Sequence, residues 1–285
     1  MTTNEKDSKI FRVAILQMSS GIDPAANADT IRTGLFEARQ GGAAMLFAPE
    51  MSLLLDRDRS RSSAHLTHEA DCPQLVELQK AARDSGVWLH LGSAAFLSEN
   101  GEGKRVNRTL IIDDDGQIRA RYDKIHLFDV DLPTGESWRE SATYAGGSSP
   151  VTVGTPWGIL GLSICYDLRF PDLYRALTDA GASILTIPAA FTVPTGEAHW
   201  HVLQRARAIE AGVFVIAAAQ CGTHADGRQT YGHSLIVDPW GGVLLDMGRE
   251  PGVGFANLDL TEISRVRTAI PALTNRRMIG PVTMM

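Results

Sequence analysis

The sequence lacks several features that would point to particular classes of protein. It has no apolar run of the roughly 18–20 residues that a helix needs to cross a bilayer. Its three cysteines, Cys72, Cys165 and Cys221, do not have the spacing of a disulfide framework. The first residues, MTTNEKDSKI, lack the apolar core of a secretory signal. We therefore expect a protein of the reducing cytoplasm, without a membrane partner.

An excess of positive charge is also missing. The 285 residues include 27 Lys and Arg against 33 Asp and Glu, which gives a formal net charge of −6. Because nucleic acids and acidic lipids attract cationic surfaces, we expect neither as a partner. Apolar residues make up 44% of the chain and charged residues 21%, which is typical of a globular protein with a sizeable core.

Short apolar runs alternate with helical patterns along the chain. The runs predict strands at 13–18, 44–50, 88–96, 159–165, 183–189, 213–220, 233–238 and 243–247. The periodic segments predict helices at 28–42, 72–86, 171–181 and 196–212, and the segment 108–124 predicts a hairpin. No low-complexity linker interrupts the pattern. We expect one domain over residues 10–275, with residues 1–9 and 276–285 as terminal arms at an interface or disordered.

Two pairs of similar stretches suggest an internal repeat. TLIIDDDGQI (109–118) is similar to SLIVDPWGGV (234–243), and LFAPE (46–50) to LTIPA (185–189). Two similar α/β halves would pack sheet against sheet with helices outside. The expected fold is therefore α/β, a four-layer αββα sandwich of two pseudo-symmetric halves. The segment 129–150 shows no periodicity and is expected to be a long functional loop.

Cys165 ends an apolar run and precedes a helical segment that begins at Pro171. At such a turn, backbone N–H groups, including that of Tyr166, would point at charge developing near the sulfur. A buried structural cysteine explains the position equally well. The stretch 161–165 resembles G-x-S-x-G, but its last glycine is absent and Ser163 lies inside the strand, which argues against a serine hydrolase.

Two further residues are candidates for the chemistry that a cysteine nucleophile needs. Glu50 follows an apolar strand, where burial would raise its pKa towards the range of a general base. Lys124 shares one face of an extended segment with His126 and would stabilise an oxyanion. The alternatives are a solvated loop glutamate and an edge-strand lysine. His126, His199, His201 and His233 are the histidines available as bases.

Neither a metal nor a cofactor is expected. Cys221 and His224 would offer two ligands, but no second pair accompanies them. No glycine-rich loop of the phosphate-binding kind occurs in a suitable context.

Three stretches in this order, LFAPE, YDKIHLFDVDLP and GLSICYDLRFPDLYRAL, resemble the nitrilase superfamily of carbon–nitrogen hydrolases, and the resemblance covers residues 11–275. It implies a catalytic triad of Glu50, Lys124 and Cys165, an αββα sandwich, and subunits that pair through outer helices as a homodimer or larger oligomer. The stretches GEAHWHVLQRARAIEAG and YGHSLIVDPWG resemble the Nit subgroup, whose members are amidases. The family's second glutamate, in the loop after the lysine, matches Glu140, with Glu136 as the fallback.

The resemblance implies a reaction through a cysteine thioester. Cys165 attacks the terminal carboxamide of a small carboxylate-bearing substrate while Glu50 accepts its proton and later returns it to departing ammonia. Lys124 and the Tyr166 N–H hold the oxyanion, and Glu140 orients the lysine or relays protons. The substrate class is deaminated glutathione-like amides; the alternatives are an ω-amidase on 2-oxoglutaramate or 2-oxosuccinamate, another amidase or carbamoylase, and a catalytically lapsed scaffold.

The substrate carboxylate needs a cation, and Arg169 is the first candidate, unless it forms a structural ion pair with Asp167. Where relatives commonly have proline, this chain has Glu197, which would disfavour an anionic substrate or pair with an arginine. Four other residues are expected to line the pocket: Phe191, Thr195, His126 and Tyr144.

Overall fold

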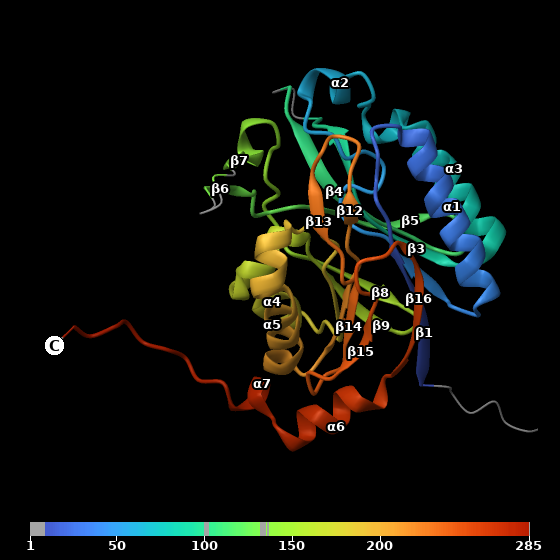
Figure 1. The fold of residues 1–285 in the computed structure, drawn as a ribbon. Helices are drawn as coiled ribbons and strands as arrows, with labels where there is room; N and C mark the ends of the chain where they lie inside the picture. The colour runs from blue at the N-terminus through green and yellow to red at the C-terminus, as the bar shows by residue number, and fades with distance from the viewer. Residues whose placement is uncertain (1–8, 100–102, 132–134, 136, 285) are drawn as a thin grey trace, which may run out of the picture.

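The computed structural model describes residues 9–99, 103–131, 135 and 137–284. Two six-stranded sheets pack face to face, with helices on both outer sides (Figure 1). Helices α1 (Pro24–Gln40) and α3 (Pro73–Ser85) cover the first sheet. The strands of this sheet are, in spatial order, β16 (Gly252–Asp259), β1 (Ile10–Gln17), β2 (Met45–Phe47), β3 (Trp88–Leu97), β4 (Arg105–Ile112) and β5 (Ile118–Asp123).

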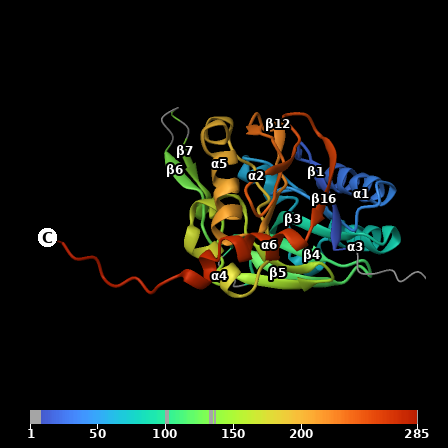
Figure 2. The same ribbon diagram turned by 90° about the horizontal axis from the view of Figure 1, so that it is seen from below.

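The second sheet is covered by α4 (Pro171–Asp179) and α5 (Val193–Ala211), on the side opposite α1 and α3 (Figure 2). Its strands are, in spatial order, β15 (Val243–Asp246), β14 (Leu235–Val237), β11 (Phe214–Ala217), β10 (Ile184–Thr186), β9 (Gly158–Leu162) and β8 (Val151–Thr155). After β16 the chain forms α6 (Thr261–Ala269) and α7 (Ala272–Asn275) and then runs away from the sheets (Figure 1).

The two sheets have the same pairing pattern. Each contains an antiparallel pair, two parallel pairs and two further antiparallel pairs, in the orders β16-β1-β2-β3-β4-β5 and β8-β9-β10-β11-β14-β15. The repeated sequences lie on equivalent strands, since one pair covers β4 and β14 and the other covers β2 and β10. The predicted αββα sandwich of two similar halves is therefore confirmed.

The main core lies between the sheets. Apolar side chains such as Phe11 and Phe47 of the first sheet join Leu162 and Ile216 of the second in one buried cluster. The parallel strands β2 and β10 are buried on both faces, which explains their continuous apolar runs. On the outer side of the first sheet, the face of α1 that carries Ile31, Leu35 and Ala38 is buried.

Three parts of the chain differ from the sequence-based expectations. The segment 129–150 contains a hairpin of β6 (Asp129–Asp131) and β7 (Ser137–Arg139), followed by the short helix η2 (Glu140–Ala142). Helix α2 (Arg59–Ser63) and the hairpin of β12 (Cys221–Thr223) and β13 (Gln229–Tyr231) were not predicted. These elements are too short for a periodic signal. Across the described ranges, no helix has the length and apolarity needed to cross a bilayer.

Candidate active site

Cys165 lies at a sharp turn at the end of β9. It is the first residue of the short helix η3 (Cys165–Arg169), and its φ of +49° is in the left-handed region that non-glycine residues rarely adopt. The Cys165 amide donates to Pro188 O at 2.9 Å, which ties the turn to the segment after β10. A strained backbone held in place by its surroundings is common at functional sites. The turn places the side chain in the wall of a cavity.

Glu50 follows β2 and is 5% exposed. Its Oε1 accepts hydrogen bonds from Lys124 Nζ at 2.9 Å and Asn107 Nδ2 at 3.0 Å, and its Oε2 accepts one from the Ala190 amide at 3.0 Å. The Gln220 side chain donates to Glu50 O at 2.9 Å and fixes its backbone. Hence the carboxylate is held by both halves of the molecule, since Ala190 follows β10.

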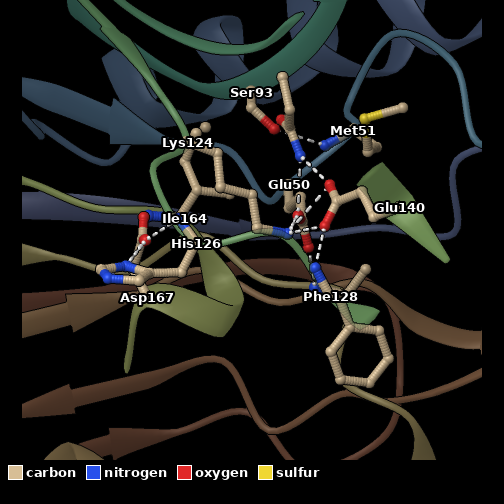
Figure 3. A network of polar contacts seen from close by, with 12 residues as sticks. Glu50, Met51, Ser93, Lys124, His126, Phe128, Glu140, Ile164 and Asp167 are labelled. Atoms are coloured by element: carbon tan, nitrogen blue, oxygen red, sulfur yellow. Dashed lines mark hydrogen bonds and ion pairs between the residues drawn. The ribbon is translucent and has the colours of Figure 1, made fainter. Parts of the chain in front are cut away.

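Lys124 follows β5, and its ammonium group lies between two carboxylates (Figure 3). Besides Glu50, it donates to Glu140 Oε2 at 2.9 Å and Oε1 at 3.2 Å. Its side chain is only 3% exposed, so the ion pairs are largely shielded from water. The alternative of a solvent-facing edge-strand lysine is excluded.

Glu140 begins η2, after the β6–β7 hairpin. It also accepts hydrogen bonds from the Phe128 amide at 2.7 Å and from Asn107 Nδ2 at 3.4 Å. One carboxylate therefore joins the hairpin segment to Lys124 and to β4. The fallback residue, Glu136, lies outside the described residues.

The charges of these groups depend on one another. Burial by itself would raise the pKa of Glu50, but the Lys124 charge and hydrogen bonds from Lys124, Cys165 and Asn107 lower it below its usual value. The expected upward shift is therefore wrong, because the cation outweighs the loss of hydration. Burial opposes the charge of Lys124, but Glu140 and Glu50 raise its pKa well above the usual value.

The thiol shows the opposite balance. Burial, and then the Glu50 charge, raise the pKa of Cys165 well above its usual value, although Lys124 and a hydrogen bond with the Ala190 backbone lower it. At neutral pH the resting site therefore holds an ionised Glu50 beside a protonated thiol, not a thiolate beside a carboxylic acid.

The backbone around the turn leaves an amide available for an oxyanion. The first N–H groups of a helix have no partner within the helix. In η3 the Cys165 amide donates to Pro188 O and the Asp167 amide to Ile164 O at 3.0 Å. The intervening Tyr166 lines the cavity with Cys165. Among the described residues, no backbone hydrogen bond is found for the Tyr166 N–H, which makes it the candidate oxyanion donor next to the sulfur.

Asp167 stabilises the turn at Cys165 through hydrogen bonds of its carboxylate. Its fully buried carboxylate accepts hydrogen bonds from the Ile164 amide at 2.9 Å, Tyr122 OH at 2.7 Å and the His126 amide at 3.0 Å. His126 Nδ1 lies 2.7 Å from the same carboxylate (Figure 3). The His126 ring stacks on Phe170, with 3.6 Å between the ring centroids. The expectation that His126 lines the substrate pocket is wrong, because it supports the turn instead.

The cavity beside Cys165 has a volume of about 490 Å³. Four of the expected pocket residues line it: Arg169, Phe191, Thr195 and Tyr144. The guanidinium of Arg169 lies 5.5 Å from the ring centroid of Phe191, and its Nη1 lies 3.3 Å from His199 Nδ1. Within the described ranges Arg169 forms no ion pair, and Asp167 pairs with His126 instead. The guanidinium is therefore available to an anion.

Sequence reasoning missed Asn107 and a group of arginines in the cavity wall. Asn107 had a usable signal, since strand alternation puts Arg105, Asn107 and Thr109 on one face of β4, and all three are buried. A row of polar residues on the inward face of a strand indicates a polar site. Beyond Arg169, the arginines lining the cavity are Arg57, Arg59, Arg105, Arg139 and Arg228.

Several other candidate residues lie outside this cavity. Ser163 is fully buried and within 2.8 Å of Tyr174 OH, which agrees with the argument against a serine nucleophile. Glu197 forms an exposed ion pair with Arg249 at 3.0 Å. It is therefore placed to pair with an arginine rather than to repel a substrate.

The described residues contain one group of possible metal ligands. His201, His233 and Asp246 place their ligand atoms within 4.8 Å of one another, and both histidines hydrogen-bond the carboxylate at 2.9 Å. None of the three lines the cavity. Of the pair considered from sequence, Cys221 is a free buried thiol, and His224 lies 2.7 Å from Thr230 Oγ1 and 2.9 Å from Ser20 O.

Comparison with known proteins places these features in a family. The carbon-nitrogen hydrolase family model matches residues 12–268. The chain is 40% identical over 280 residues to the deaminated glutathione amidase of Bos taurus, covering 97% of this chain and 85% of the relative. It is 38% identical over 276 residues to that of Yersinia enterocolitica, covering 95% of both.

A solved structure supports the same assignment. Saccharomyces cerevisiae Nit3, a member of branch 10 of the nitrilase superfamily, matches with a TM-score of 0.84 and 28% identity, covering 94% of this chain and 97% of that one. The chain therefore belongs to the carbon–nitrogen hydrolase family and has the fold of the nitrilase superfamily.

Proposed function

We propose that this carbon–nitrogen hydrolase cleaves the amide of a small carboxylate-bearing substrate through a thioester on Cys165. The observation that carries the proposal is the contact of Lys124 with two buried carboxylates, Glu50 and Glu140, beside the thiol. Such a group supplies a base, a fixed cation and a nucleophile around one carbon. Glu140 and Asn107 position these groups.

The resting protonation state determines the order of proton transfers. Sulfur attacks the amide carbon while the thiol proton passes to Glu50, and the oxyanion is held by Lys124 and the Tyr166 N–H. Glu50 then gives this proton to the leaving nitrogen as the C–N bond breaks. A water molecule then attacks the thioester carbon while Glu50 takes its proton. As the C–S bond breaks, Glu50 gives this proton to the sulfur, which restores the thiol and the ionised carboxylate.

The cavity arginines favour a carboxylate-bearing substrate, and the similar deaminated glutathione amidases supply a candidate. In deaminated glutathione the reactive amide nitrogen carries a substituent. Its cleavage releases an amine, cysteinylglycine, together with 2-oxoglutarate. The expected release of ammonia applies only to a primary amide such as 2-oxoglutaramate, the substrate of the ω-amidase alternative.

Two measurements test the proposal. Wild-type protein incubated with deaminated glutathione should release 2-oxoglutarate, and rapid quenching should trap an acyl adduct whose mass maps to Cys165. Cys165→Ala should give neither. If the wild type hydrolyses neither deaminated glutathione nor 2-oxoglutaramate, the catalytically lapsed scaffold becomes the better description.

The assembly is also part of the proposal. We expect residues 10–275 to act as one cytoplasmic domain with terminal arms, and to pair with a second copy. Helix α5 and the β14–β15 hairpin expose large apolar side chains, including Val202 (68%), Ile209 (53%) and Trp240 (55%). A second copy packed on this face would remove them from water. Val202→Glu should then lower the mass measured by light scattering to that of a monomer.

A further inference from the structure

Arg57 and Arg228 form a cationic site in the cavity wall, contributed by elements that the sequence did not predict. Both guanidinium groups lie over the ring of Trp138, at 5.9 Å and 4.8 Å from its centroid. Arg57 precedes α2, Trp138 is on β7, and Arg228 precedes β13. Three separate segments therefore converge on one aromatic ring.

This site has more positive than negative charge. Both guanidinium groups reach the same carboxylate, Asp226, at 3.8 Å for Arg57 and 3.3 Å for Arg228. The side chain of Asp226 is fully buried, and the side chain of Arg228 is only 17% exposed. The Nε of Arg228 has no hydrogen-bond partner within the described ranges, and burial lowers the pKa of this residue. Asp56 and Glu50 also lie near Arg228, but Asp56 is held by Arg61 and Glu50 by Lys124. Among the described residues Asp226 is thus the carboxylate that pairs with both cations, and a second anion would complete the site.

A row of aromatic rings connects this site with Arg169. The guanidinium of Arg169 lies 6.0 Å from the ring centroid of Tyr166, which is 5.1 Å from that of Phe128. Phe128 is in turn 6.2 Å from Trp138, the ring that carries the second cationic site. The two cationic sites are therefore the ends of a continuous series of contacts along the cavity wall.

The reactive groups lie at the middle of this row. The amide of Phe128, the central residue, donates to Glu140, which in turn holds Lys124. Tyr166, the next ring, follows Cys165 directly. An amide bound at Cys165 would therefore lie between the two cationic ends of this row.

We propose that Arg57 and Arg228 bind a carboxylate on the leaving amine, while Arg169 binds the carboxylate of the acyl part. This inference rests on the proposed amidase function and narrows its substrate to N-substituted amides with an anionic group in both products. Deaminated glutathione fits this class, because its 2-oxo acid and its glycine each carry a carboxylate. A primary amide leaves the second site empty.

The test compares three substrates that share one acyl group. They are deaminated glutathione, the same compound with its glycine carboxylate converted to a neutral amide, and 2-oxoglutaramate. Release of 2-oxoglutarate gives kcat/KM for each. Wild type should prefer the charged compound to its neutral form by about 10- to 100-fold, the range of a hydrogen bond to a charged group.

Arg228→Gln should remove this preference, lowering kcat/KM for deaminated glutathione by about the same factor and leaving the other two substrates unchanged. Arg57→Gln should act in the same direction. Because Arg57 is half-exposed, this variant tests the same site even if the Arg228 variant does not fold. Arg228→Lys should recover part of the preference, because it keeps the charge but loses the planar fork. Arg249→Gln, outside the cavity, is the matched control.

The outcomes separate the two proposals. If the wild type cleaves the charged and neutral compounds equally well, or if the Arg57 and Arg228 variants slow all three substrates by one factor, the leaving-amine site is wrong while the amidase function stands. If the wild type cleaves none of the three, the proposed function itself fails.

Discussion

The side-chain amide of Asn107 donates a hydrogen bond to Glu50 at 3.0 Å, and the same nitrogen lies 3.4 Å from Glu140. It therefore links the two carboxylates that hold Lys124. Its Oδ1 is buried without a hydrogen-bond partner among the described residues. The amide acts on the chemistry through its donor, which favours the ionised form of Glu50.

Asn107→Leu should therefore shift the pH dependence of kcat/KM as well as lower its maximum. Loss of the donor raises the pKa of Glu50, so the acidic limb of kcat/KM against pH should move to higher pH. We expect a drop in the plateau of about 10-fold, the size of one lost charged hydrogen bond. A lower plateau with an unmoved acidic limb would instead mean that Asn107 only supports the fold.

Lys124→Met should make the protein less stable at neutral and alkaline pH. It leaves Glu50 and Glu140 buried without their cation, which costs about 3–5 kcal/mol in comparable cases. Urea unfolding at pH 8 and pH 5 measures the effect. Lys80→Met, which removes an exposed pair with Asp84, is the control and should change stability little.

The direction of this pH dependence should differ from that of the wild type. In the wild type the pKa of Glu50 is lowered, so its stabilising contribution is present above its usual pKa and is lost as the pH falls. In the variant the lowering by Lys124 is gone, and burial, the largest effect, is opposed only by hydrogen bonds such as those from Cys165 and Asn107. The pKa of Glu50 should therefore rise, and the destabilisation should shrink on acidification. Equal losses at both pH values would contradict the proposed charge state.

Glu50→Gln should change thiol reactivity and catalysis in opposite directions. The charge of Glu50 raises the pKa of Cys165, so its removal should shift the alkylation of Cys165 by iodoacetamide to lower pH. Hydrolysis should fall by at least about 100-fold, because the group proposed as the general base is gone. Cys72 and Cys221 serve as internal controls for labelling, because both are buried and Glu50 is not among the causes given for their pKa shifts. A wild-type Cys165 that is already a thiolate at pH 7 would contradict the resting state described above.

His126→Phe should leave substrate binding intact and lower stability. The ring stack on Phe170 can be retained, but the hydrogen bond to Asp167 is lost. We expect an unchanged KM and a melting temperature lower by a few degrees, as for a loss of about 1 kcal/mol. Arg169→Gln should do the reverse, raising KM with little effect on melting. A raised KM for the His126 variant would instead mean that His126 lines the substrate pocket.

Local sequence patterns predicted much of the fold. Buried parallel strands such as β2 and β10 show continuous apolar runs, and the hairpin of β4 and β5 carries its Asp-Gly turn. The stretches around Glu50, Lys124 and Cys165 pointed to these residues because each lies at the end of a predictable strand. Their close approach depends on how the strands are ordered, which the resemblance supplied and periodicity did not.

The remaining parts of the site depend on contacts between distant segments. Arg57 and Arg228 meet at Trp138 only because two short elements and a hairpin pack together, and none of these has a periodic pattern. The pKa of Glu50 was predicted in the wrong direction because burial was visible from sequence, whereas the neighbouring cation was not. His126 was misplaced because its partner, Asp167, comes 41 residues later.

Glu50 and Lys124 follow strands of the first sheet and Cys165 follows a strand of the second, so neither sheet holds the complete set of groups proposed for catalysis. Turnover is consequently a sensitive readout of how the two sheets dock. A molecule in which both sheets had formed but had slipped by one pleat against each other would keep its circular dichroism spectrum and still be inert. A chain cut between β7 and β8 would regain activity only on correct reassociation, since β16, which pairs with β1, would remain on the fragment that carries the second sheet.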